Sequence, residues 1–318
     1  MTEVLSPAAG PPSSGAPGPD MSQFDSSQAR KQSVVIIKRF MRHRLAVLGM
    51  GLFVFLMLFA FLGSALWKHD HTDLGFPAYS PPSGEHPFGT DRIGADMTAQ
   101  LIRGLQFSLR IALIVALVST IIGVTLGALA GFKRGWVDAL ISRFIDLVLV
   151  IPGLVIVVVL SRSSFVNVPG QSSSNWLLVA FYLSAVFWLP TARIVRGMVL
   201  SLREKEFVEA ARAMGGSTFR IVFRHILPNT VDVIIVNVTL AVASAVLAEA
   251  AISFLGLGVR PPDTSLGLLI NQNRNELNIH PWLFFIPFAV IVLVSLSVNF
   301  MGDGLRDAFD PRQRRVRA

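Results

Sequence analysis

Six long apolar segments constrain the fold of this chain more than any other feature. They span residues 45–67, 107–132, 139–160, 176–195, 231–255 and 282–300. Each is about as long as the roughly 20 residues with which an α-helix crosses a bilayer. Because lipid offers the backbone no hydrogen-bond partners, such segments are expected to be helical. The sequence therefore predicts an all-α polytopic membrane protein with six transmembrane helices.

The composition supports a membrane protein and excludes several kinds of site. Hydrophobic residues make up 52% of the chain and charged residues 15%, whereas ordinary globular proteins carry about 25% charged residues. The net charge of +8 does not indicate a nucleic-acid partner, because the Lys and Arg residues cluster beside the apolar segments. The chain has no cysteine, which excludes disulfides, thiolate metal sites and cysteine nucleophiles.

The placement of basic residues predicts the orientation of the spans. Most of the 28 lysines and arginines lie before the first segment, between the second and third, between the fourth and fifth, and after the sixth. Basic connections remain on the cytoplasmic side of a membrane. The N- and C-termini are therefore predicted to be cytoplasmic, and six spans satisfy that parity.

The ends of the chain are expected to differ from its membrane domain. Residues 1–29 are rich in Pro, Gly, Ser and Ala and contain no Lys or Arg, which predicts a disordered cytoplasmic tail. We expect a cytoplasmic basic segment at 30–44, the transmembrane domain at 45–311 and a basic cytoplasmic tail at 312–318. No signal peptide is expected, because the first apolar segment starts late and is longer than a signal core.

The connection at residues 201–229 predicts a helix, a turn and a second helix. Its first half is rich in good helix formers, with an apolar stripe at three- and four-residue spacing formed by Phe207, Ala210, Ala211 and Met214. Gly215 and Gly216 are expected to end that helix. Ser217 can cap a second helix, whose stripe consists of Phe219, Phe223 and Ile226 and which stops near Pro228.

Two uses of this loop fit its residue types. The small side chains of Ala210 and Ala211 would let a helix approach a partner closely, while Glu209 supplies a carboxylate for a hydrogen bond or an ion pair. Alternatively, the loop is an amphipathic helix that lies on lipid headgroups with its arginines on the wet face.

The spacing of six residues in this loop resembles the pattern of a known family. Glu209-Ala210-Ala211 is followed after three residues by Gly215, and after eleven more by Leu227-Pro228. This pattern resembles the cytoplasmic signature of the membrane-spanning subunits of bacterial ABC importers. The resemblance implies the type I ABC importer permease fold, with these six residues in a coupling loop that docks onto a separate ATPase subunit. The chain departs from the pattern at His225, where family members often have Ile, and this departure puts the packing of the second helix in doubt.

Two further stretches resemble one branch of that family, the dipeptide, oligopeptide and nickel importers, and within it the second permease subunit. They are His86–Asp91 with Gly94 and Asp96, which precede Gly104 and Ser108-Leu109, and Glu249–Val259 with Pro261-Pro262. The resemblance covers about residues 45–311. It implies a non-catalytic subunit in a bacterial plasma (inner) membrane that forms half of a pathway for di- and oligopeptides. Nickel or haem-like cargo remains an alternative.

The resemblance also implies the partners. They are a homologous second permease, two ATP-binding subunits, an extracellular or periplasmic solute-binding protein, the lipid bilayer and a peptide substrate. No lysine in the sequence follows a glycine, so a phosphate-binding Gly-Lys-Ser/Thr loop is absent. This chain is therefore expected to hold no cofactor, with ATP and Mg bound by the partner subunits and no catalytic residue of its own.

Charged residues within the apolar segments suggest a second functional position. Glu249 is the best candidate for a pathway or helix-ordering role, because intramembrane carboxylates usually face protein or water. Arg143 and Asp146 share a helix face and can pair, and Pro152 with Gly153 predicts a kink. An ion-coupled secondary transporter would need such carboxylates in paired, repeated helices, and no internal repeat is evident. A membrane-embedded enzyme has no supporting motif.

Two histidines raise the question of a metal site. His69 and His71 flank Asp70 in the connection after the first segment. Two histidines in a wet loop rarely complete a coordination sphere, so no metal site is expected.

Overall fold

The first apolar segment forms a helix with a short extension. In the computed structural model, which describes residues 34–162 and 176–309, helix α2 (Arg44–Phe61) is followed by α3 (Gly63–Leu66). His43 caps α2, because its Nδ1 accepts a hydrogen bond from the amide of Ala46 at 3.1 Å. A further helical stretch at 34–42 precedes this cap.

Helix α4 (Met97–Lys133) begins ten residues before the apolar segment predicted at 107–132. Asp96 starts the helix, since its Oδ1 accepts a hydrogen bond from the amide of Thr98 at 2.8 Å. At about 1.5 Å per residue, 37 residues extend roughly 55 Å, well beyond a hydrocarbon layer of about 30 Å. The extra turns contain polar side chains that are buried. Gln106, for example, donates from Nε2 to the carbonyl of Ala60 at 2.6 Å.

The third apolar segment, predicted as one kinked span at 139–160, is two helices. Helices α5 (Gly135–Val150) and α6 (Gly153–Arg162) meet at an angle of 86°. The break falls at Ile151-Pro152, where the proline has no amide hydrogen to continue the helix. The described chain thus contains five long apolar helices, or six spans if this bent pair is counted as one.

The remaining long helices follow the apolar pattern and extend it. They are α7 (Trp176–Leu202), α10 (Val231–Phe254) and α12 (Pro281–Phe309). The shorter elements are α8 (Glu206–Ala213), α9 (Thr218–Ile221), a π-helical turn (Val222–Ile226), a 3₁₀ turn (Leu227–Asn229), α11 (Leu266–Asn273) and a second 3₁₀ turn (Arg274–Glu276). No strand occurs in the ranges that the structure describes, so the predicted all-α class is confirmed.

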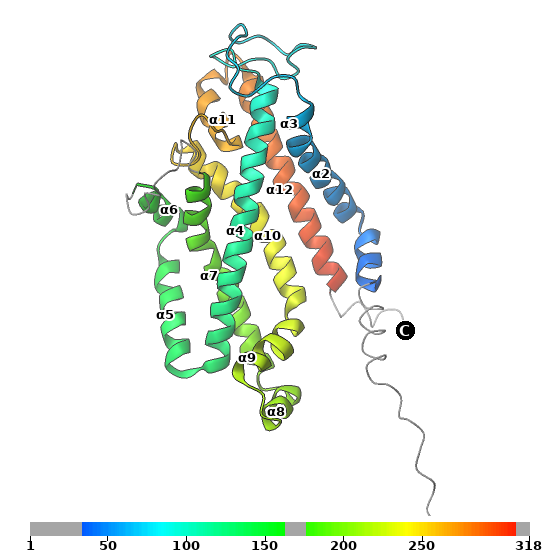
Figure 1. Cartoon of the computed structure of the whole chain (residues 1–318), viewed down its shortest axis with the longest axis vertical. Coiled ribbons are helices and arrows are strands. Elements are labelled where there is room, and N and C mark those ends of the chain that lie inside the picture. The colour runs from blue at the N-terminus through cyan, green and yellow to red at the C-terminus, as the bar shows by residue number, and fades with distance from the viewer. Residues whose placement is uncertain (1–33, 163–175, 310–318) are drawn as a thin grey trace, which may run out of the picture.

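Helix α4 is the centre of the bundle, and α7 packs closely along it (Figure 1). Gly123, Gly127 and Gly131 line the α4 side of this contact. A Cβ atom added at Gly127 would lie 2.5 Å from the carbonyl oxygen of Ala192. Small residues at four-residue spacing allow this kind of close backbone approach between helices in membranes.

The contact predicts that Gly127→Val destabilises the protein. The added side chain must push α4 and α7 apart, and overpacking of this kind costs about 1–3 kcal/mol. We expect a lower midpoint of thermal unfolding for the purified chain in detergent. Gly197→Val is the matched control, since Gly197 is also helical but a Cβ there meets nothing within 4 Å. Equal midpoints for the two variants would contradict the close packing.

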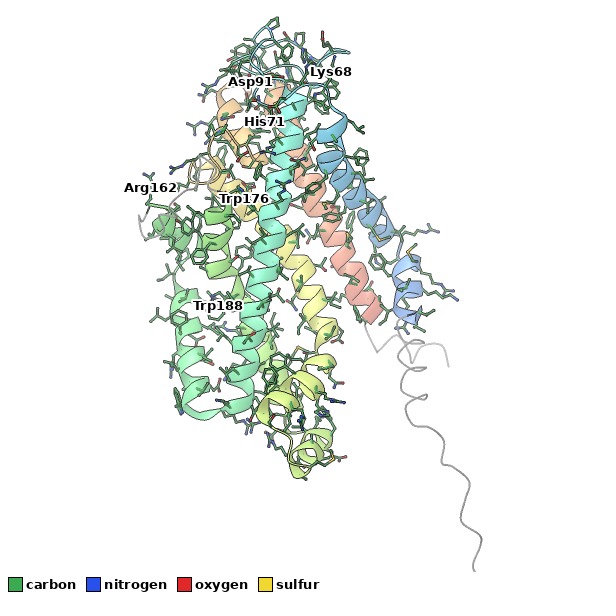
Figure 2. The ribbon with its side chains drawn as sticks, viewed as in Figure 1. Lys68, His71, Asp91, Arg162, Trp176 and Trp188 are labelled. Atoms are coloured by element: carbon green, nitrogen blue, oxygen red, sulfur yellow. The ribbon has the colours of Figure 1, made fainter. Side chains whose placement is uncertain are left out.

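The two ends of the bundle carry different structures. Figure 1 shows α8 and α9 at one extreme, beyond the end of α5. The connection from Trp67 to Asp96, which we call the cap segment, covers the opposite extreme. Figure 2 places Lys68, His71 and Asp91 together at that end. Along the flank, large apolar side chains of α2 and α5 such as Phe55 and Leu147 are exposed, as expected of surfaces that face lipid.

Candidate functional site

The loop between α7 and α10 begins with helix α8, which ends in a left-handed turn. Gly215 has φ +78°. The amide of Gly215 donates to the carbonyl of Arg212 at 2.9 Å, and the amide of Gly216 donates to the carbonyl of Ala211 at 3.0 Å. A Cβ at Gly215 would meet nothing within 4 Å, so the glycine is required for its backbone conformation and not for space.

The second half of the loop is three short pieces where the sequence predicted one helix. Ser217 caps α9 as predicted, and its Oγ accepts from the amide of Arg220 at 3.4 Å. The next turn is π-helical, with the amide of Leu227 donating to the carbonyl of Val222. A π turn accommodates one residue more than an α turn. Ile226, which stands one position later than in the family pattern, is fully buried all the same.

The buried face of the loop anchors it to the long helices. Val208, Ala211, Ile221, Val222 and Ile226 pack in one cluster with Phe132 of α4 and Val199 of α7. The guanidinium of Arg203 donates to the carbonyl of Phe132 at 2.5 Å, and that of Arg212 lies 5.2 Å from the Phe132 ring. The loop is therefore fastened directly to the ends of α4 and α7.

The residues of the two predicted apolar stripes divide between the buried and exposed sides of the loop, and most of the large ones point outward. Phe207, Met214, Phe219 and Phe223 are 40%, 79%, 71% and 47% exposed. The rings of Phe219 and Phe223 lie 4.3 Å apart. We call these four side chains the outer face of the loop. Contiguous exposed apolar side chains usually mark an interaction site, so this face can bind a protein or a membrane surface.

The six residues singled out in this loop by the sequence do not share one environment. Glu209, Ala210, Gly215 and Pro228 are exposed, Leu227 is half-buried and Ala211 is buried. The exposed residues lie on the same loop as the outer face. Ala211 belongs instead to the anchoring cluster.

Glu249 lies far from this loop, in a buried hydrogen-bond network. Its side chain is 0% exposed. Ser108 of α4 donates to Oε2 at 2.7 Å, and Ser253, one turn further along α10, donates to Oε1 at 2.6 Å. The amide of Leu266 donates to the Ser108 hydroxyl at 3.2 Å. The carboxylate thus links α4, α10 and the start of α11.

Two ion pairs join α5 and α7. Asp146 of α5 accepts from Arg193 of α7 at 2.5 Å, so the predicted pairing of Asp146 with Arg143 is wrong. Asp138 and Arg196 form a second, bidentate pair at 2.5 and 2.9 Å between the same two helices. Sequence spacing could not reveal these pairs, because the arginines of α7 are far from α5 in the sequence and approach it only in the folded bundle.

A groove of about 380 Å³ opens beside the break between α5 and α6. Its lining is mostly apolar and includes Pro152 and Pro190, with Thr191, Asn237 and Ser244 as polar members. Glu249 does not line it.

Comparison with known proteins agrees with this architecture. The family of binding-protein-dependent transport system inner membrane components matches residues 123–315. The N-terminal transmembrane domain of oligopeptide transport permease C matches residues 32–82. The oligopeptide transport system permease protein OppC of Mycobacterium tuberculosis (strain H37Rv) is 38% identical over 284 residues, which cover 89% of this chain and 96% of that protein.

A second relative and a solved structure complete the comparison. OppC of Escherichia coli (strain K12) is 40% identical over 280 residues, covering 87% of this chain and 90% of that protein. An inward-facing structure of the MetNI methionine ABC transporter has a TM-score of 0.52 at 19% identity, covering 67% of this chain and 98% of that chain. That likeness concerns the fold alone. The chain belongs to the family of binding-protein-dependent transport system inner membrane components, and within it to the oligopeptide branch of ABC importer permeases.

Proposed function

We propose that this chain forms half of the membrane pathway of an ATP-driven importer of di- and oligopeptides, and that the loop at 201–229 docks onto a separate ATPase subunit. The chain itself is non-catalytic in this proposal, and ATP and Mg bind to the ATPase subunits. The observation that carries it is the outer face of the loop, because its large apolar side chains are exposed on a structure packed firmly against α4 and α7.

The position of the loop favours a protein partner over lipid headgroups. A helix that lies on a membrane buries its apolar face at the headgroup level. Here α8 lies beyond the end of α5 (Figure 1), and Met214 at its tip is 79% exposed. Exposed Arg212, Arg220 and Arg224 surround the apolar side chains with charge, which suits the polar rim of a protein interface.

The remaining partners follow from the same proposal. A homologous second permease completes the pathway, two ATP-binding subunits drive it, and an extracellular or periplasmic solute-binding protein delivers peptide. The groove beside Pro152 and Pro190, with Asn237 and Ser244 in its lining, supports a pathway wall on this side of the bundle. Docking to an ATPase places the loop, and with it both termini, in the cytoplasm of a bacterial plasma (inner) membrane.

Co-purification tests the docking. The chain is expressed with its ATP-binding subunits, which are recognised by a Gly-Lys-Ser/Thr phosphate loop. We expect Phe219→Asp/Phe223→Asp to lose the ATPase subunits, because buried charges without partners disrupt an interface. Leu74→Asp is the matched control, since Leu74 is 59% exposed in the cap segment, and it should retain them. Full retention by the double variant would contradict docking through this face.

Uptake assays test the cargo separately. Cells that lack this chain should lose uptake of defined di- and tripeptides and regain it with the wild-type gene. Unchanged peptide uptake, together with loss of nickel or haem uptake, would reject peptides as cargo and leave the docking proposal standing.

A further inference from the structure

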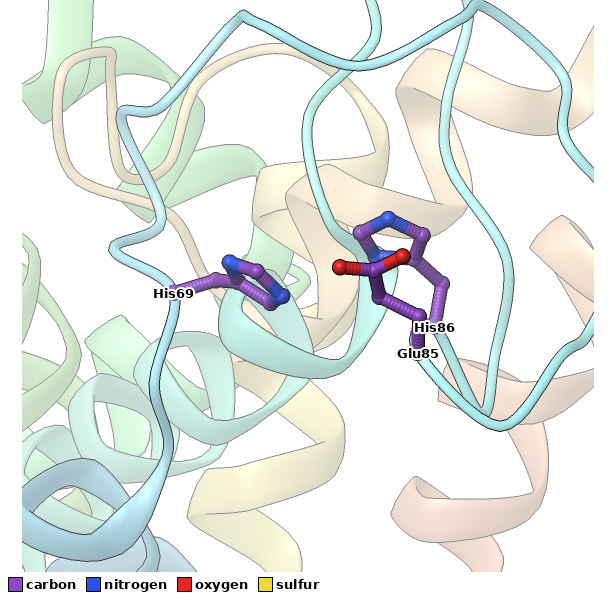
Figure 3. Close-up of side chains that lie close together, drawn as sticks. All are labelled: His69, Glu85 and His86. Atoms are coloured by element: carbon purple, nitrogen blue, oxygen red, sulfur yellow. The ribbon is translucent and has the colours of Figure 1, made fainter.

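Three side chains of the cap segment converge at the end of the molecule opposite to α8. His69 follows α3, whereas Glu85 and His86 lie in the later part of the segment. One potential ligand atom from each residue lies within 4.8 Å of the other two. Figure 3 shows the Glu85 carboxylate in front of the His86 ring, with the His69 ring facing them from one side.

Two ring nitrogens in this cluster have no hydrogen-bond partner. Nε2 of His69 and Nδ1 of His86 are both buried, and neither finds a donor or acceptor among the described residues. Leaving a buried polar atom unpaired costs about 1–3 kcal/mol. The His86 side chain is only 8% exposed, and its Nδ1 lies 3.7 Å from Oδ2 of Asp96, which is beyond hydrogen-bond range. That Asp96 oxygen already accepts from Trp67 Nε1 at 2.7 Å.

The neighbouring side chains hold the two imidazole rings in place but provide no hydrogen bond to these nitrogens. Phe76 packs against both rings, with centroid distances of 4.7 Å to His69 and 4.5 Å to His86. Glu85 contacts the ammonium of Lys68 at 3.6 Å, but both side chains are more than half exposed. An exposed pair of this kind is worth at most about 1 kcal/mol. The Glu85 carboxylate is therefore available to a stronger partner.

We propose that His69 Nε2, His86 Nδ1 and the Glu85 carboxylate bind one divalent first-row transition metal ion, with Zn²⁺ as the best match. Two imidazoles and one carboxylate are a characteristic zinc donor set, with bonds of about 2.0–2.2 Å and a fourth position for water. The carboxylates of Glu85 and Asp96 balance the charge of the ion. The Glu85 side chain is exposed and can rotate toward the ion.

The ion would be a structural cross-link between two parts of the cap segment. It ties the chain just after α3 to the chain just before Gly89, and so fixes the cover over the ends of α4 and α12. His71, which the sequence paired with His69, is not part of the cluster. Its Nδ1 lies 3.1 Å from Oδ1 of Asp70 instead.

Zinc titration of the full-length chain tests the proposal. The protein is purified in detergent without a polyhistidine tag, stripped with a chelator and titrated with Zn²⁺ against a chromophoric competitor. We expect one equivalent per chain, at least tenfold weaker binding in His69→Ala and in Glu85→Gln, and unchanged binding in His71→Ala. Zinc should also raise the unfolding midpoint of the wild type and of His71→Ala, but not that of His69→Ala.

Two results would overturn the site. One is the absence of a stoichiometric zinc equivalent in the wild type. The other is binding that survives His69→Ala and Glu85→Gln but falls in His71→Ala. Since His69 is only half-buried and Glu85 is exposed, these two variants are expected to fold, so the test does not depend on a substitution of buried His86. Helical circular dichroism verifies their folding.

Discussion

Gly215→Trp is expected to abolish peptide uptake while ATP hydrolysis by the assembled complex continues. Gly215 adopts φ +78° on the exposed turn between the two halves of the loop, and a side chain there meets nothing within the chain. The bundle should therefore fold and insert into the membrane. The indole would project from the turn beside Met214 and prevent a close fit of the loop against the ATPase. We expect uptake to fall at least tenfold.

The backbone cost of this substitution must be separated from the effect on docking. A non-glycine residue at positive φ costs about 1–2 kcal/mol, whichever side chain it carries. Gly135→Trp is the matched control, because Gly135 has φ +62° and equally open surroundings but is the first residue of α5, outside the loop. The measurements are uptake in cells and ATPase activity of the purified complex. Equal losses in both variants would mean that backbone strain, and not coupling, explains the phenotype.

Glu249→Ala is expected to be the most damaging substitution within the membrane. It leaves the hydroxyls of Ser108 and Ser253 without their acceptor and opens a void at a site that is 0% exposed. A hydrogen bond between helices in a bilayer is worth about 0.6–2 kcal/mol, and the void adds a cavity cost. We expect a combined destabilisation of about 2–4 kcal/mol, seen as a lower unfolding midpoint and reduced abundance in the membrane.

The glutamine variant decides between the two roles considered for Glu249. Glu249→Gln keeps the size of the side chain and one acceptor oxygen, and the serine hydroxyls can reorient toward it. A helix-ordering role predicts near-normal stability and transport in this variant. A pathway role that needs the carboxylate predicts normal stability with lost transport. Leu147, which is 64% exposed on the flank of α5, provides the control, since Leu147→Ala should change neither quantity.

The sequence predicted the helices better than their ends. Hydropathy identifies stretches that are apolar enough to lie in the hydrocarbon layer, so the predicted second span begins at Phe107. Hydropathy cannot show that residues 97–106, which include several polar side chains, are almost all buried and belong to the same helix. The cap at Ser217 and the turn at Gly215 were predictable because they depend on local backbone chemistry alone.

Contacts between distant parts of the sequence were not predictable from pattern. On α8, Val208 and Phe207 are both apolar neighbours, and periodicity cannot tell which of them the bundle buries. The structure buries Val208. His69 and His86 are 17 positions apart, with no spacing motif between them, and they meet only because the cap segment folds back. Asp146 likewise finds its arginine on α7.

The glycine-lined contact between α4 and α7 has a mechanical consequence. Because their backbones approach each other so closely, the two helices have little room to slide or repack and form one stiff strut. The loop is fastened to one end of this strut through Phe132 and Val199, and the other end of α4 reaches the aspartates of the cap segment. In the proposed docking mode, a movement of the loop would therefore shift α4 and α7 together.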